Sequence, residues 1–501
     1  MKNILEYLEN TAKKYPDKIG FTDSKRKVSF ASLTENAKRI AVSLKNIEKN
    51  SPVIIATERS VKCIEAMFAA VYAGCFYTIA DINSPKSRLE IISKQLSPKA
   101  VITDSKAEEH ISGIFQNAEI IRYDDAVTND IDENFITQRR KSMVDTDTLY
   151  VLFTSGSSGI PKGAVLSHRS VINYIQWATT EFSFNEKTSF GAQTPLHFSM
   201  SVTDLFSTVK CGGTYNIIPK EYFSFPVKLI EYINDRKINT LYWVPSALGI
   251  AFNWNLFEYI APQYIQTVLF AGEVMPSKYL NYWKKYLPHC TFANLFGPTE
   301  TTDICTFYVV DRNFSDDEAI PIGRSCDNCD VMLIKDDGTP ALPGEEGEMM
   351  VRGSFLADGY YNDDEKTVSA FIQNPLNDKY PEKVYRTGDI ARLNEKGEFI
   401  YINRRDFQIK RMGYRIELGE IETAANSLCG VISAAAVYEQ KKEKIILIYE
   451  GREKDESKIK SAACKKLPEY MYPDKVIRVD FMPLNSNGKI DRSMLGRVSW
   501  I

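Results

Sequence analysis

One segment of the chain reads Leu149-Tyr-Val-Leu-Phe-Thr-Ser-Gly-Ser-Ser-Gly-Ile-Pro-Lys-Gly163. Residues 149–153 are apolar and rich in strand formers, so they predict a buried strand that ends where the loop begins. In the loop, Gly156 and Gly159 free the backbone, and amides and hydroxyls can turn together toward an anion. Lys162 adds a compact positive charge. The segment therefore predicts a strand followed by a loop that binds an oligophosphate.

Two familiar phosphate-binding patterns do not fit this loop. The P-loop has Gly directly before its Lys, where this chain has Pro161, and the dinucleotide fingerprint has a GxGxxG spacing that Gly156 and Gly159 do not provide. Residues 53–60, at an early buried strand, contain no glycine, which argues against a dinucleotide-binding oxidoreductase. Since a loop rich in Ser and Gly is by itself more often a solvated turn, the function depends on residues farther along the chain.

Apolar runs and helical patterns alternate on both sides of the loop. A helix over 31–45 precedes a strand over 53–56, and Gly74 can end the helix that follows. Such alternation predicts an α/β fold with largely parallel sheets covered by helices. The other expected elements are helices at 61–73, after Ser84-Pro85 and after Ser167, and strands at 76–79, 100–103, 240–244 and 267–271.

The pattern changes in the later part of the chain. Beyond Pro321, residues 331–334, 348–351 and 399–402 predict antiparallel strands. The final residues form a separate α+β pattern that is long enough for a small domain. It comprises expected helices at 417–428 and 457–466 and strands at 434–438, 444–449 and 476–479. We therefore expect a large domain over 1–405 and a small, mobile domain over 406–501.

The composition narrows the class of protein. With 44% hydrophobic and 25% charged residues the chain has the profile of a soluble globular protein, and its net charge of −3 favours neither nucleic acid nor anionic lipid. No run is long enough to span a membrane, and residues 1–10 predict an amphipathic helix rather than a signal peptide. Nine scattered cysteines suggest reduced thiols, and the lone CxxC at Cys326 and Cys329 lacks a second pair for zinc. We expect a cytoplasmic protein that binds neither nucleic acid nor membranes.

Six motifs follow one another along nearly the whole chain. They read Thr154-Ser-Gly-Ser-Ser-Gly-Ile-Pro-Lys-Gly163, Asn294-Leu-Phe-Gly-Pro-Thr-Glu-Thr-Thr302, Tyr385-Arg-Thr-Gly-Asp389, Asn403-Arg-Arg-Asp-Phe-Gln-Ile-Lys410, Gly413-Tyr-Arg-Ile-Glu-Leu-Gly-Glu420 and Asn487-Gly-Lys-Ile-Asp-Arg492. Their order and separations resemble those of the adenylate-forming superfamily of acyl-CoA ligases, luciferases and carrier-loading adenylation enzymes. The last motif is most similar to that of stand-alone carrier-protein ligases, which include D-alanine–carrier protein ligase, and of nonribosomal peptide synthetase adenylation domains.

The resemblance implies a two-step reaction with ATP and Mg²⁺ as cofactors. A carboxylic acid would attack the α-phosphate of ATP, releasing pyrophosphate and leaving an acyl-AMP, and the phosphopantetheine thiol of a separate carrier protein would then take the acyl group. Catalysis would be mostly positioning and electrostatic stabilisation, because charge builds up on the phosphoryl oxygens. A CoA ligase of the same fold is one alternative. A non-catalytic binding module is another, which the joint presence of Lys489, Glu300 and Asp389 disfavours.

The resemblance also implies which residues hold the nucleotide. Thr299 would hydrogen-bond the α-phosphate and Glu300 would bind Mg²⁺, which prefers hard oxygen ligands. Asp389 would accept the ribose hydroxyls, and Arg404 would contact the nucleotide at the domain border. The adenine would lie against Asn294, Leu295 and Phe296. The outer phosphates would lie in the loop formed by Thr154, Ser155, Gly156, Ser157, Ser158, Gly159 and Lys162.

Lys489 has a role that only the resemblance supplies, since a lysine in a polar loop is ordinarily a solvated charge. It would bridge the acyl carboxylate and the oxygens of the ribose and α-phosphate. Because Lys489 is far in sequence from the phosphate loop, a mobile small domain must deliver it, with Asp406 as the hinge. Rotation about this hinge would then bring the Gly413-Tyr-Arg415 string to the thiol tunnel. Asp358, where the family usually has Arg, is a departure that we expect at the surface.

Ser199 is the departure that bears on the substrate. Relatives that activate amino acids have Asp in the string Phe-Asp-x-Ser, where it pairs with the α-ammonium, whereas this chain reads Phe198-Ser199-Met200-Ser201. A buried ammonium without a carboxylate partner is costly, so we expect an acid that lacks an α-amino group or has its amine elsewhere. The walls of the acid pocket would be His197, Phe198, Ser199, Met200, Thr203, Tyr242, Leu269, Ala271, Gly272, Leu295, Asp303 and Ile304.

Asp303 stands out among these walls, because a carboxylate among apolar neighbours requires a partner. A distal amine or a phenol hydroxyl would suit it, so we expect a hydroxy- or aminobenzoic acid, or a β- or ω-amino acid. In the alternative reading, Asp303 turns outward as a charge at a helix N-terminus. His168, at the start of the helix after Ser167, is expected to be a surface histidine.

Overall fold

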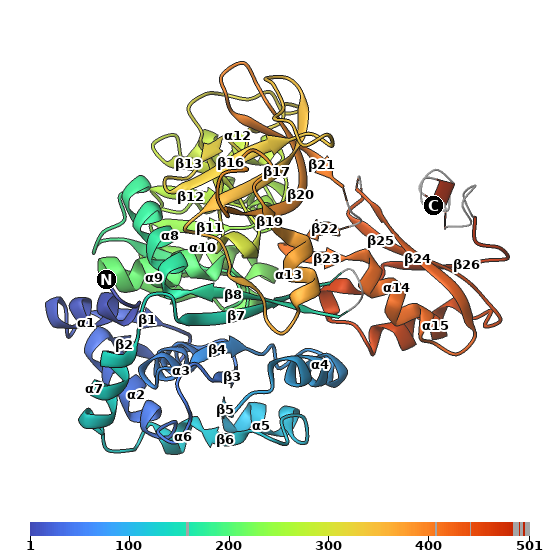
Figure 1. The fold of residues 1–501 in the computed structure, drawn as a ribbon. Coiled ribbons are helices and arrows are strands. Elements are labelled where there is room, and N and C mark those ends of the chain that lie inside the picture. The colour runs from blue at the N-terminus through green and yellow to red at the C-terminus, as the bar shows by residue number, and fades with distance from the viewer. Residues whose placement is uncertain (157–159, 406–407, 441, 484–489, 491–493, 496–501) are drawn as a thin grey trace. The chain divides into compact units, whose positions relative to one another are not determined.

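The computed structural model describes residues 1–501 except 157–159, 406–407, 441, 484–489, 491–493 and 496–501 (Figure 1). Contacts group the chain into two compact units. Unit 1 comprises Met1–Ile82, Leu96–Leu152 and Gly163–Arg405, and unit 2 comprises Asn83–Gln95, Phe153–Lys162 and Asp406–Ile501. The division that the sequence predicts, 1–405 and 406–501, differs from this grouping in residues 83–95 and 153–162.

A mostly parallel seven-stranded sheet begins near the N-terminus. In the order in which they pair, its strands are β18 (Gly359–Tyr360), β8 (Lys162–Ser167), β7 (Thr148–Thr154), β4 (Phe76–Ile79), β3 (Pro52–Ala56), β5 (Ala100–Thr103) and β6 (Glu119–Arg122). The pairs β3 with β4, β3 with β5, β4 with β7 and β5 with β6 are parallel. The strand expected at 149–153 therefore lies within a parallel sheet, as the alternating pattern predicts.

Helices cover this sheet with their apolar faces. The helix α3 (Val61–Tyr72) is buried over nearly its whole length, and Gly74 follows it at φ 72°, a left-handed conformation that glycine adopts without strain. The helix α2 (Phe30–Val42) packs on α3 and starts at Ser29, whose Oγ accepts a hydrogen bond from the Ser32 amide. The other helices of this region are α1 (Leu5–Lys14), α5 (Ser105–Ile111), α6 (Tyr123–Ala126) and α7 (Glu133–Ser142).

A second sheet of nine strands holds most of the residues expected around the acid. The order is β15 (Arg324–Ser325), β14 (Thr306–Val309), β13 (Thr291–Phe296), β12 (Thr267–Phe270), β11 (Thr240–Trp243), β9 (Ser189–Ala192), β10 (Thr214–Ile217), β1 (Ile19–Thr22) and β2 (Lys27–Ser29). Six strands pair in parallel, namely β13, β12, β11, β9, β10 and β1, and antiparallel strands close both edges. The helical elements are α8 (His168–Glu181), α9 (Ser201–Cys211), η1 (Lys220–Ser224), α10 (Pro226–Asp235), α11 (Pro245–Asn253), η2 (Leu256–Glu258), α12 (Ser277–Tyr286) and η3 (Thr299–Thr301).

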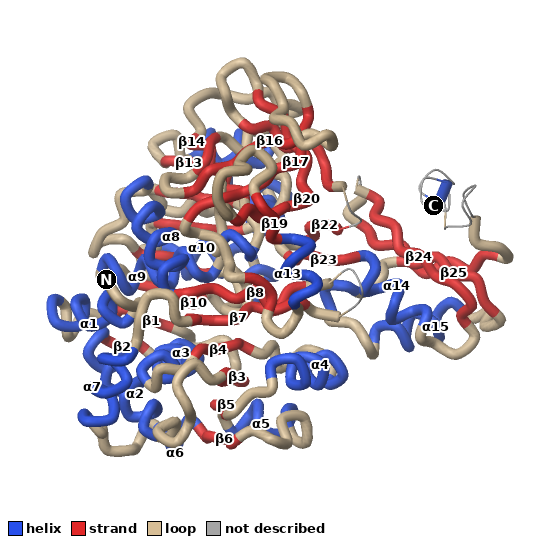
Figure 2. The backbone as a smooth tube through the Cα atoms, in the orientation of Figure 1, coloured by secondary structure: helices blue, strands red, loops and turns tan. Residues whose placement is uncertain are grey.

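The remainder of unit 1 is an antiparallel sheet, as the hairpin pattern beyond Pro321 predicts. Its strands are β16 (Cys329–Ile334), β17 (Glu346–Gly353), β20 (Lys383–Leu393) and β19 (Phe371–Gln373), with β21 (Phe399–Arg404) on the other edge of β20. The helix α13 (Asp364–Ala370) precedes β19. Figure 2 shows these strands gathered in one region, apart from the helices that cover the parallel sheets.

Unit 2 has the α+β pattern that the sequence predicts for the final residues. Its three-stranded sheet is β24 (Val431–Glu439), β25 (Lys444–Gly451) and β26 (Lys475–Val479), and alternate residues of β25 contribute to separate clusters on its two faces. The helices α14 (Leu418–Asn426) and α15 (Glu456–Cys464) supply the apolar cluster of one face. The unit also contains α4 (Lys86–Leu96), the hairpin of β22 (Gln408–Arg411) and β23 (Tyr414–Glu417), and η4 (Glu469–Met471).

No helix in the described part of the chain is long and apolar enough to cross a membrane. All nine cysteines, each within the described ranges, are free thiols, and Cys326 and Cys329 are both buried. In the same described ranges no three His, Cys, Asp or Glu side chains are grouped so as to hold a metal ion.

Candidate active site

The expected acid pocket lies at the carboxyl ends of parallel strands, where α/β sheets commonly bind ligands. Tyr242 on β11 stands beside Leu269 on β12, which in turn stands beside Ala293 on β13. Ala271 and Gly272 follow the end of β12, and Leu295 lies near the end of β13. The segment that leads into α9 carries His197 and Phe198, both half-buried, then Ser199 and the buried Met200.

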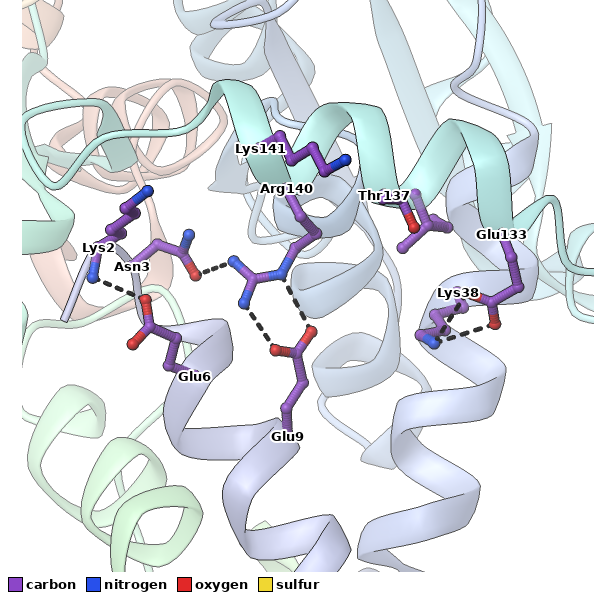
Figure 3. A pocket seen from close by; sticks show the side chains of 10 residues that line it. Lys2, Asn3, Glu6, Glu9, Lys38, Glu133, Thr137, Arg140 and Lys141 are labelled. Carbon is purple, nitrogen blue, oxygen red and sulfur yellow. Dashed lines mark hydrogen bonds and ion pairs between the residues drawn. The ribbon is translucent and has the colours of Figure 1, made fainter.

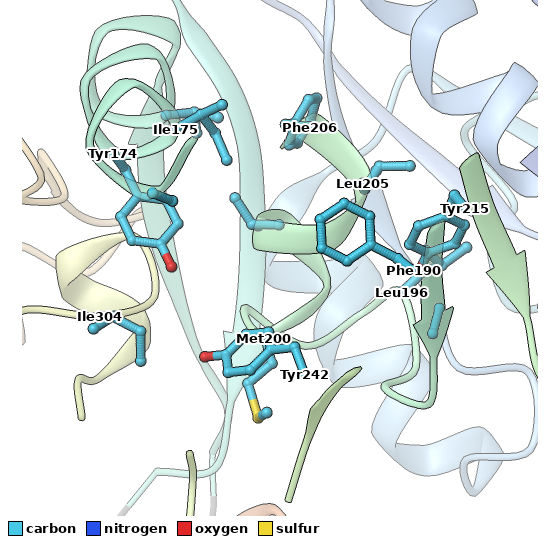
Figure 4. Close-up of a cluster of buried hydrophobic side chains, with 14 of the residues drawn as sticks. Tyr174, Ile175, Phe190, Leu196, Met200, Leu205, Phe206, Tyr215, Tyr242 and Ile304 are labelled. Atoms are coloured by element: carbon cyan, nitrogen blue, oxygen red, sulfur yellow. The ribbon is translucent and has the colours of Figure 1, made fainter. Parts of the chain in front are cut away.

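Asp303 is buried at the centre of these residues. Its side-chain oxygen Oδ2 accepts hydrogen bonds from the hydroxyls of Thr203 at 2.7 Å, Tyr174 at 3.0 Å and Tyr242 at 3.0 Å. Only 1% of the residue is exposed, so the alternative in which Asp303 turns outward is wrong. Figure 4 shows the hydroxyls of Tyr174 and Tyr242 turned into the same space, next to Ile304 and Met200. The structure thus brings three expected pocket residues, Thr203, Tyr242 and Asp303, into direct contact.

The hydroxyls around Asp303 form a directed chain of donors. Tyr174 and Thr203 are 2.6 Å apart, oxygen to oxygen, which is shorter than the contact from Tyr174 to Asp303. Because a hydroxyl has one proton, the geometry favours donation from Tyr174 to Thr203 and from Thr203 to Asp303, with Tyr242 as a second donor. Thr203 and Tyr242 then present their protons to Asp303, and Tyr174 presents its proton to Thr203. This arrangement suits the charged form of Asp303.

Burial and hydrogen bonding act in opposite directions on Asp303. Burial raises the pKa of Asp303 to about 6, although hydrogen bonds from Thr203, Tyr174, Tyr242 and Ser199 oppose the increase. Burial, reinforced by the charge of Asp303, also raises the pKa of Tyr174 and of Tyr242 well above 10, so both phenols remain donors. No basic side chain within the described residues forms an ion pair with Asp303. The cluster is therefore a buried anion held by neutral donors.

A second buried carboxyl group, Asp204 on α9, lies near enough to interact with the first. Burial raises its pKa well above the ordinary value, and the charge of Asp303 adds to this increase, whereas Arg59 opposes it. Two carboxylates that share a poorly solvated region cannot both ionise at low cost. Asp204 and Asp303 therefore oppose each other's ionisation, and burial disfavours the charged form of both.

Ser199, expected in the acid pocket, contacts a residue expected at the α-phosphate. The hydroxyl of Thr299, on η3, donates to Ser199 Oγ at 3.4 Å. A hydrogen bond from Ser199 also lowers the pKa of Asp303. The position where amino-acid-activating relatives have a carboxylate therefore holds a hydroxyl that reaches both Thr299 and Asp303.

Glu300 is the residue expected to bind Mg²⁺, and its surroundings suit that role. Its side chain is fully buried, and Tyr360 donates a hydrogen bond to Oε1 at 2.7 Å. A buried carboxylate is a hard oxygen donor of the kind that Mg²⁺ takes together with phosphate oxygens and water. With Glu300 as a protein ligand, nucleotide phosphates and water would complete the coordination.

Asp389 and Arg404, both expected at the nucleotide, lie opposite each other on β20 and β21. They form an ion pair with a 2.9 Å contact between Arg404 Nη1 and Asp389 Oδ1, and Arg404 also donates to the Thr387 carbonyl at 3.0 Å. Both side chains are buried. The pair fixes the orientation of the carboxylate that the resemblance assigns to the ribose.

Asn294, Leu295 and Phe296, expected around the adenine, all lie on β13. The amide of Asn294 donates to the carbonyl of Pro321 at 2.8 Å, and the Phe296 ring lies 5.9 Å from that of Tyr401. Asn294 therefore braces the backbone that leads into the antiparallel sheet. The ring of Phe296 packs against Tyr401, on β21 of that sheet, and its role at adenine stays a prediction.

The phosphate loop is described in part. Thr154 Oγ1 donates to the Lys162 carbonyl at 3.4 Å, and Ser155 Oγ donates to the Arg415 carbonyl at 2.6 Å within unit 2. A Cβ atom on Gly156 would lie 2.1 Å from the Ile160 carbonyl oxygen, so the loop requires glycine there. Five expected site residues lie outside the described residues, namely Ser157, Ser158, Gly159, Asp406 and Lys489.

The sequence reasoning missed two tyrosines and misplaced one histidine. Tyr174 lies on the buried face of α8, so its spacing alone predicts a core residue. Tyr360 lies in a two-residue strand, too short for a periodic pattern. His168 is buried rather than exposed because the Ile4 amide, from the N-terminal segment, donates to its Nδ1 at 3.3 Å. Burial lowers the pKa of His168 to about 3, so it is a neutral structural residue.

A charged hollow elsewhere on unit 1 contains none of the expected site residues. Figure 3 shows that it lies along α1, α2 and α7, with Arg140 bound to Glu9 and to Asn3, and Lys38 bound to Glu133. Because these charges compensate one another, the hollow has the properties of a solvated ion-pair network. The buried cluster around Asp303 and Glu300 remains the candidate site.

Known proteins are similar to this chain over most of its length. The family described as AMP-binding enzyme matches residues 8–361. The chain belongs to this family. It is 30% identical to the L-proline–[L-prolyl-carrier protein] ligase of Pseudomonas fluorescens over 99% of both chains. It is also 28% identical to the D-alanine–D-alanyl carrier protein ligase of Lacticaseibacillus casei, over 98% of both chains.

Solved structures confirm the fold of this AMP-binding enzyme. The structure of holo-PA1221, a nonribosomal peptide synthetase protein with adenylation and PCP domains, matches with a TM-score of 0.83 at 21% identity. The match covers 99% of this chain and 84% of that one. The mixed α/β architecture is therefore that of adenylation enzymes, and the AMP-binding enzyme described here is an adenylate-forming ligase that uses ATP.

Proposed function

We propose that this AMP-binding enzyme activates a carboxylic acid whose amine lies away from the α-carbon, and then transfers the acyl group to the phosphopantetheine thiol of a separate carrier protein. The observation that supports this substrate class is the buried carboxylate of Asp303, held by three hydroxyls, together with a hydroxyl at Ser199. The relatives named for L-proline and D-alanine favour an amine in the substrate.

The position of the amine follows from charge. An α-ammonium beside Ser199 would meet a hydroxyl rather than a carboxylate. An amine farther along the substrate would instead meet Asp303, and the two opposite charges would form a charge-assisted hydrogen bond. This favours β- or ω-amino acids. Aminobenzoic and hydroxybenzoic acids are the second candidates, because an aromatic amine is uncharged near pH 7 and, like a phenol, donates to Asp303 but leaves its charge uncompensated.

In the first step the acid carboxylate attacks the α-phosphorus of ATP, the bond to the β,γ-diphosphate breaks, and acyl-AMP and pyrophosphate form. Mg²⁺ would neutralise phosphate charge at Glu300, and Thr299 would donate to an α-phosphate oxygen. Asp389, oriented by Arg404, would accept from the ribose hydroxyls. Lys489 would donate to the acyl and phosphate oxygens. In the second step the thiolate attacks the acyl carbon and AMP leaves, which gives the thioester.

The acceptor thiol separates this function from that of a CoA ligase with the same fold. Two relatives of nearly equal length are named for carrier proteins, which supports a carrier supplied in trans. AMP release should be measured with the acid, ATP and either CoA or a panel of phosphopantetheinylated carriers. Faster release with CoA than with every carrier would favour the CoA ligase.

The substrate class is tested by ATP–pyrophosphate exchange with matched acids. Aminobenzoates, β-alanine and 4-aminobutyrate should support exchange, whereas benzoate and L-α-amino acids should not. The variant Asp303→Asn should lose about 10- to 100-fold in kcat/KM for the amino substrate, because a hydrogen bond to a charged group contributes roughly 1.5–3 kcal/mol. Vigorous exchange with L-α-amino acids, and none with aminobenzoates, β-alanine or 4-aminobutyrate, would contradict the proposal.

A further inference from the structure

Residues 355–361, here called the bridging segment, contact the loop that carries Glu300 at three points. The Thr302 hydroxyl donates to the Phe355 carbonyl at 2.8 Å, and the Ala357 amide donates to the Glu300 carbonyl at 2.8 Å. The Tyr360 hydroxyl donates to Glu300 Oε1 at 2.7 Å. One contact holds the loop backbone at Glu300, one holds the Thr302 side chain, and the third holds the Glu300 carboxylate itself.

The same segment pairs with β8, the strand that starts at Lys162 as the chain leaves the phosphate loop. Gly359 and Tyr360 lie opposite Val165 and Ala164 in antiparallel register. Amides of the bridging segment also donate to β8 carbonyls, from Asp358 to Val165 at 2.9 Å and from Tyr361 to Gly163 at 2.8 Å. The segment therefore joins the Glu300 loop to the strand that leaves the phosphate loop.

Further contacts orient Tyr360. Its amide donates to Thr367 Oγ1, on α13, at 2.9 Å, and its ring packs edge-on against Phe371 at 5.7 Å. A Cβ atom on Gly359 would lie 2.6 Å from Thr367 Cγ2, so glycine permits α13 to approach this closely. The side chain is 5% exposed, and its hydroxyl reaches Glu300 without freedom to swing away.

We propose that Tyr360 is a positioning residue for the carboxylate that binds Mg²⁺. This inference rests on the proposed role of Glu300 and adds the residue that orients it. A phenol that donates to Oε1 holds the plane of the carboxylate, so that the metal ion meets a preformed ligand. Outer groups of this kind typically change metal affinity by about 10- to 100-fold when they are removed. Through β8, the same contact couples the metal ligand to the strand that follows the phosphate loop.

The adjacent Tyr361 provides a matched control. It is half-buried, its ring lies 5.6 Å from that of Phe76, and none of the hydrogen bonds between described residues uses its hydroxyl. The variants Tyr360→Phe and Tyr361→Phe each remove one phenol oxygen from neighbouring positions.

Calorimetric titration should measure ATP binding at increasing Mg²⁺ concentration, and again with the metal chelated. For half-maximal ATP binding, Tyr360→Phe should need a Mg²⁺ concentration at least about 10-fold higher than wild type. Binding of metal-free ATP should stay at the wild-type level, and Tyr361→Phe should behave as wild type throughout.

Equal Mg²⁺ requirements in wild type and Tyr360→Phe would overturn the inference about Tyr360 while leaving the proposed role of Glu300 intact. If wild-type ATP binding did not depend on Mg²⁺ at all, the role of Glu300 itself would fail. Should Tyr360→Phe not fold, 3-fluorotyrosine incorporated at position 360 keeps the shape and alters the strength of the donor. It should shift the Mg²⁺ requirement, whereas the same replacement at position 361 should not, and equal requirements would again overturn the inference.

Discussion

Asp303 introduces a negative charge into the interior of unit 1, with hydroxyl donors on three sides. Most buried carboxylates in proteins pair with a basic side chain, because the attraction offsets the loss of hydration. Here the hydroxyls offset part of that loss, and the raised pKa of Asp303 reports the remainder. A cationic substrate would supply the missing charge, so its binding depends on the ionisation of this single residue.

The pH dependence of activity should reveal this ionisation. Because the pKa of Asp303 in the folded protein is raised to about 6, the anion that attracts an amine is present above that pH and is lost as pH falls through it. For an amino acid substrate, kcat/KM in pyrophosphate exchange should therefore fall about tenfold per pH unit below pH 6. An acid without an amine that the enzyme accepts should show no such decrease of kcat/KM below pH 6. Identical pH profiles for acids with and without an amine would count against the role of Asp303.

At the scale of elements, α8, α9 and β11 together build the environment of Asp303. Each contributes one hydroxyl, Tyr174, Thr203 and Tyr242 respectively, and the donor chain from Tyr174 to Thr203 links two helices beneath the carboxylate. Losing the first hydroxyl of this chain weakens the second as a donor, because hydrogen bonds in a network polarise one another. The helix α8 therefore influences the acid site through a residue that need not touch the acid.

The variant Tyr174→Phe should raise the pKa of Asp303 and shift the acidic limb of the pH profile upward. It should also lower the free energy of unfolding by about 1 kcal/mol, the usual contribution of a buried hydrogen bond. Tyr150→Phe is the control, because Tyr150 is buried nearby with a hydroxyl that has no partner among the described residues. Urea unfolding and pH profiles of both variants measure the two effects. A shift of the limb in Tyr150→Phe as large as in Tyr174→Phe would speak against the donor chain.

The buried carboxylate of Glu65 accepts hydrogen bonds from three other segments of the chain. It lies on α3 with no exposure, and Arg26, Asn36 and Tyr123 all donate to its carboxylate. The variant Arg26→Met would leave a buried charge with neutral donors alone, so the free energy of unfolding should fall by about 3 kcal/mol. Glu65→Gln in the same background should recover part of the loss, because it removes the uncompensated charge. Denaturant unfolding measures both, and additive losses in the double variant would contradict a direct pairing.

Some of these elements could be predicted from the sequence, and others could not. The strands β4 and β5 have the expected bounds, and Ser167 caps α8 as expected, because local apolar runs and capping hydroxyls carry that information. The burial of His168 could not be predicted, since it depends on a segment far away in sequence. The same holds for Asp303: its residue type indicated a need for a partner, but only the packed structure shows that the chain itself supplies three hydroxyls.

At the scale of the whole molecule, the residues expected to act on one ATP are distributed along most of the chain. Glu300, Asp389 and Arg404 belong to unit 1, whereas Thr154, Ser155 and Lys162 group with unit 2. Lys489 lies outside the described residues, so its role remains a prediction from the sequence. In the family's reaction scheme the two chemical steps use different surfaces of the small domain, so removal of Lys489 should separate them.

The variant Lys489→Ala should abolish pyrophosphate exchange while largely sparing thioester formation from preformed acyl-AMP. Adenylation needs the Lys489 ammonium at the reacting oxygens, whereas thioester formation needs the same space for the thiol. Exchange and single-turnover transfer should both be measured, with Lys475→Ala, another lysine of the C-terminal region, as a control that alters neither. Retained exchange in Lys489→Ala would remove this lysine from the adenylation step.

The arrangement around Asp303 also suggests how selectivity could be inverted. Truncating this residue to alanine would vacate a carboxylate-sized space while keeping the proton donors of Thr203, Tyr174 and Tyr242 aimed at it. A dicarboxylic acid could place its second carboxylate there, since the surrounding groups already complement an anion. The three hydroxyls that now surround the Asp303 carboxylate would, after one substitution, form a receptor for an anionic group of the substrate.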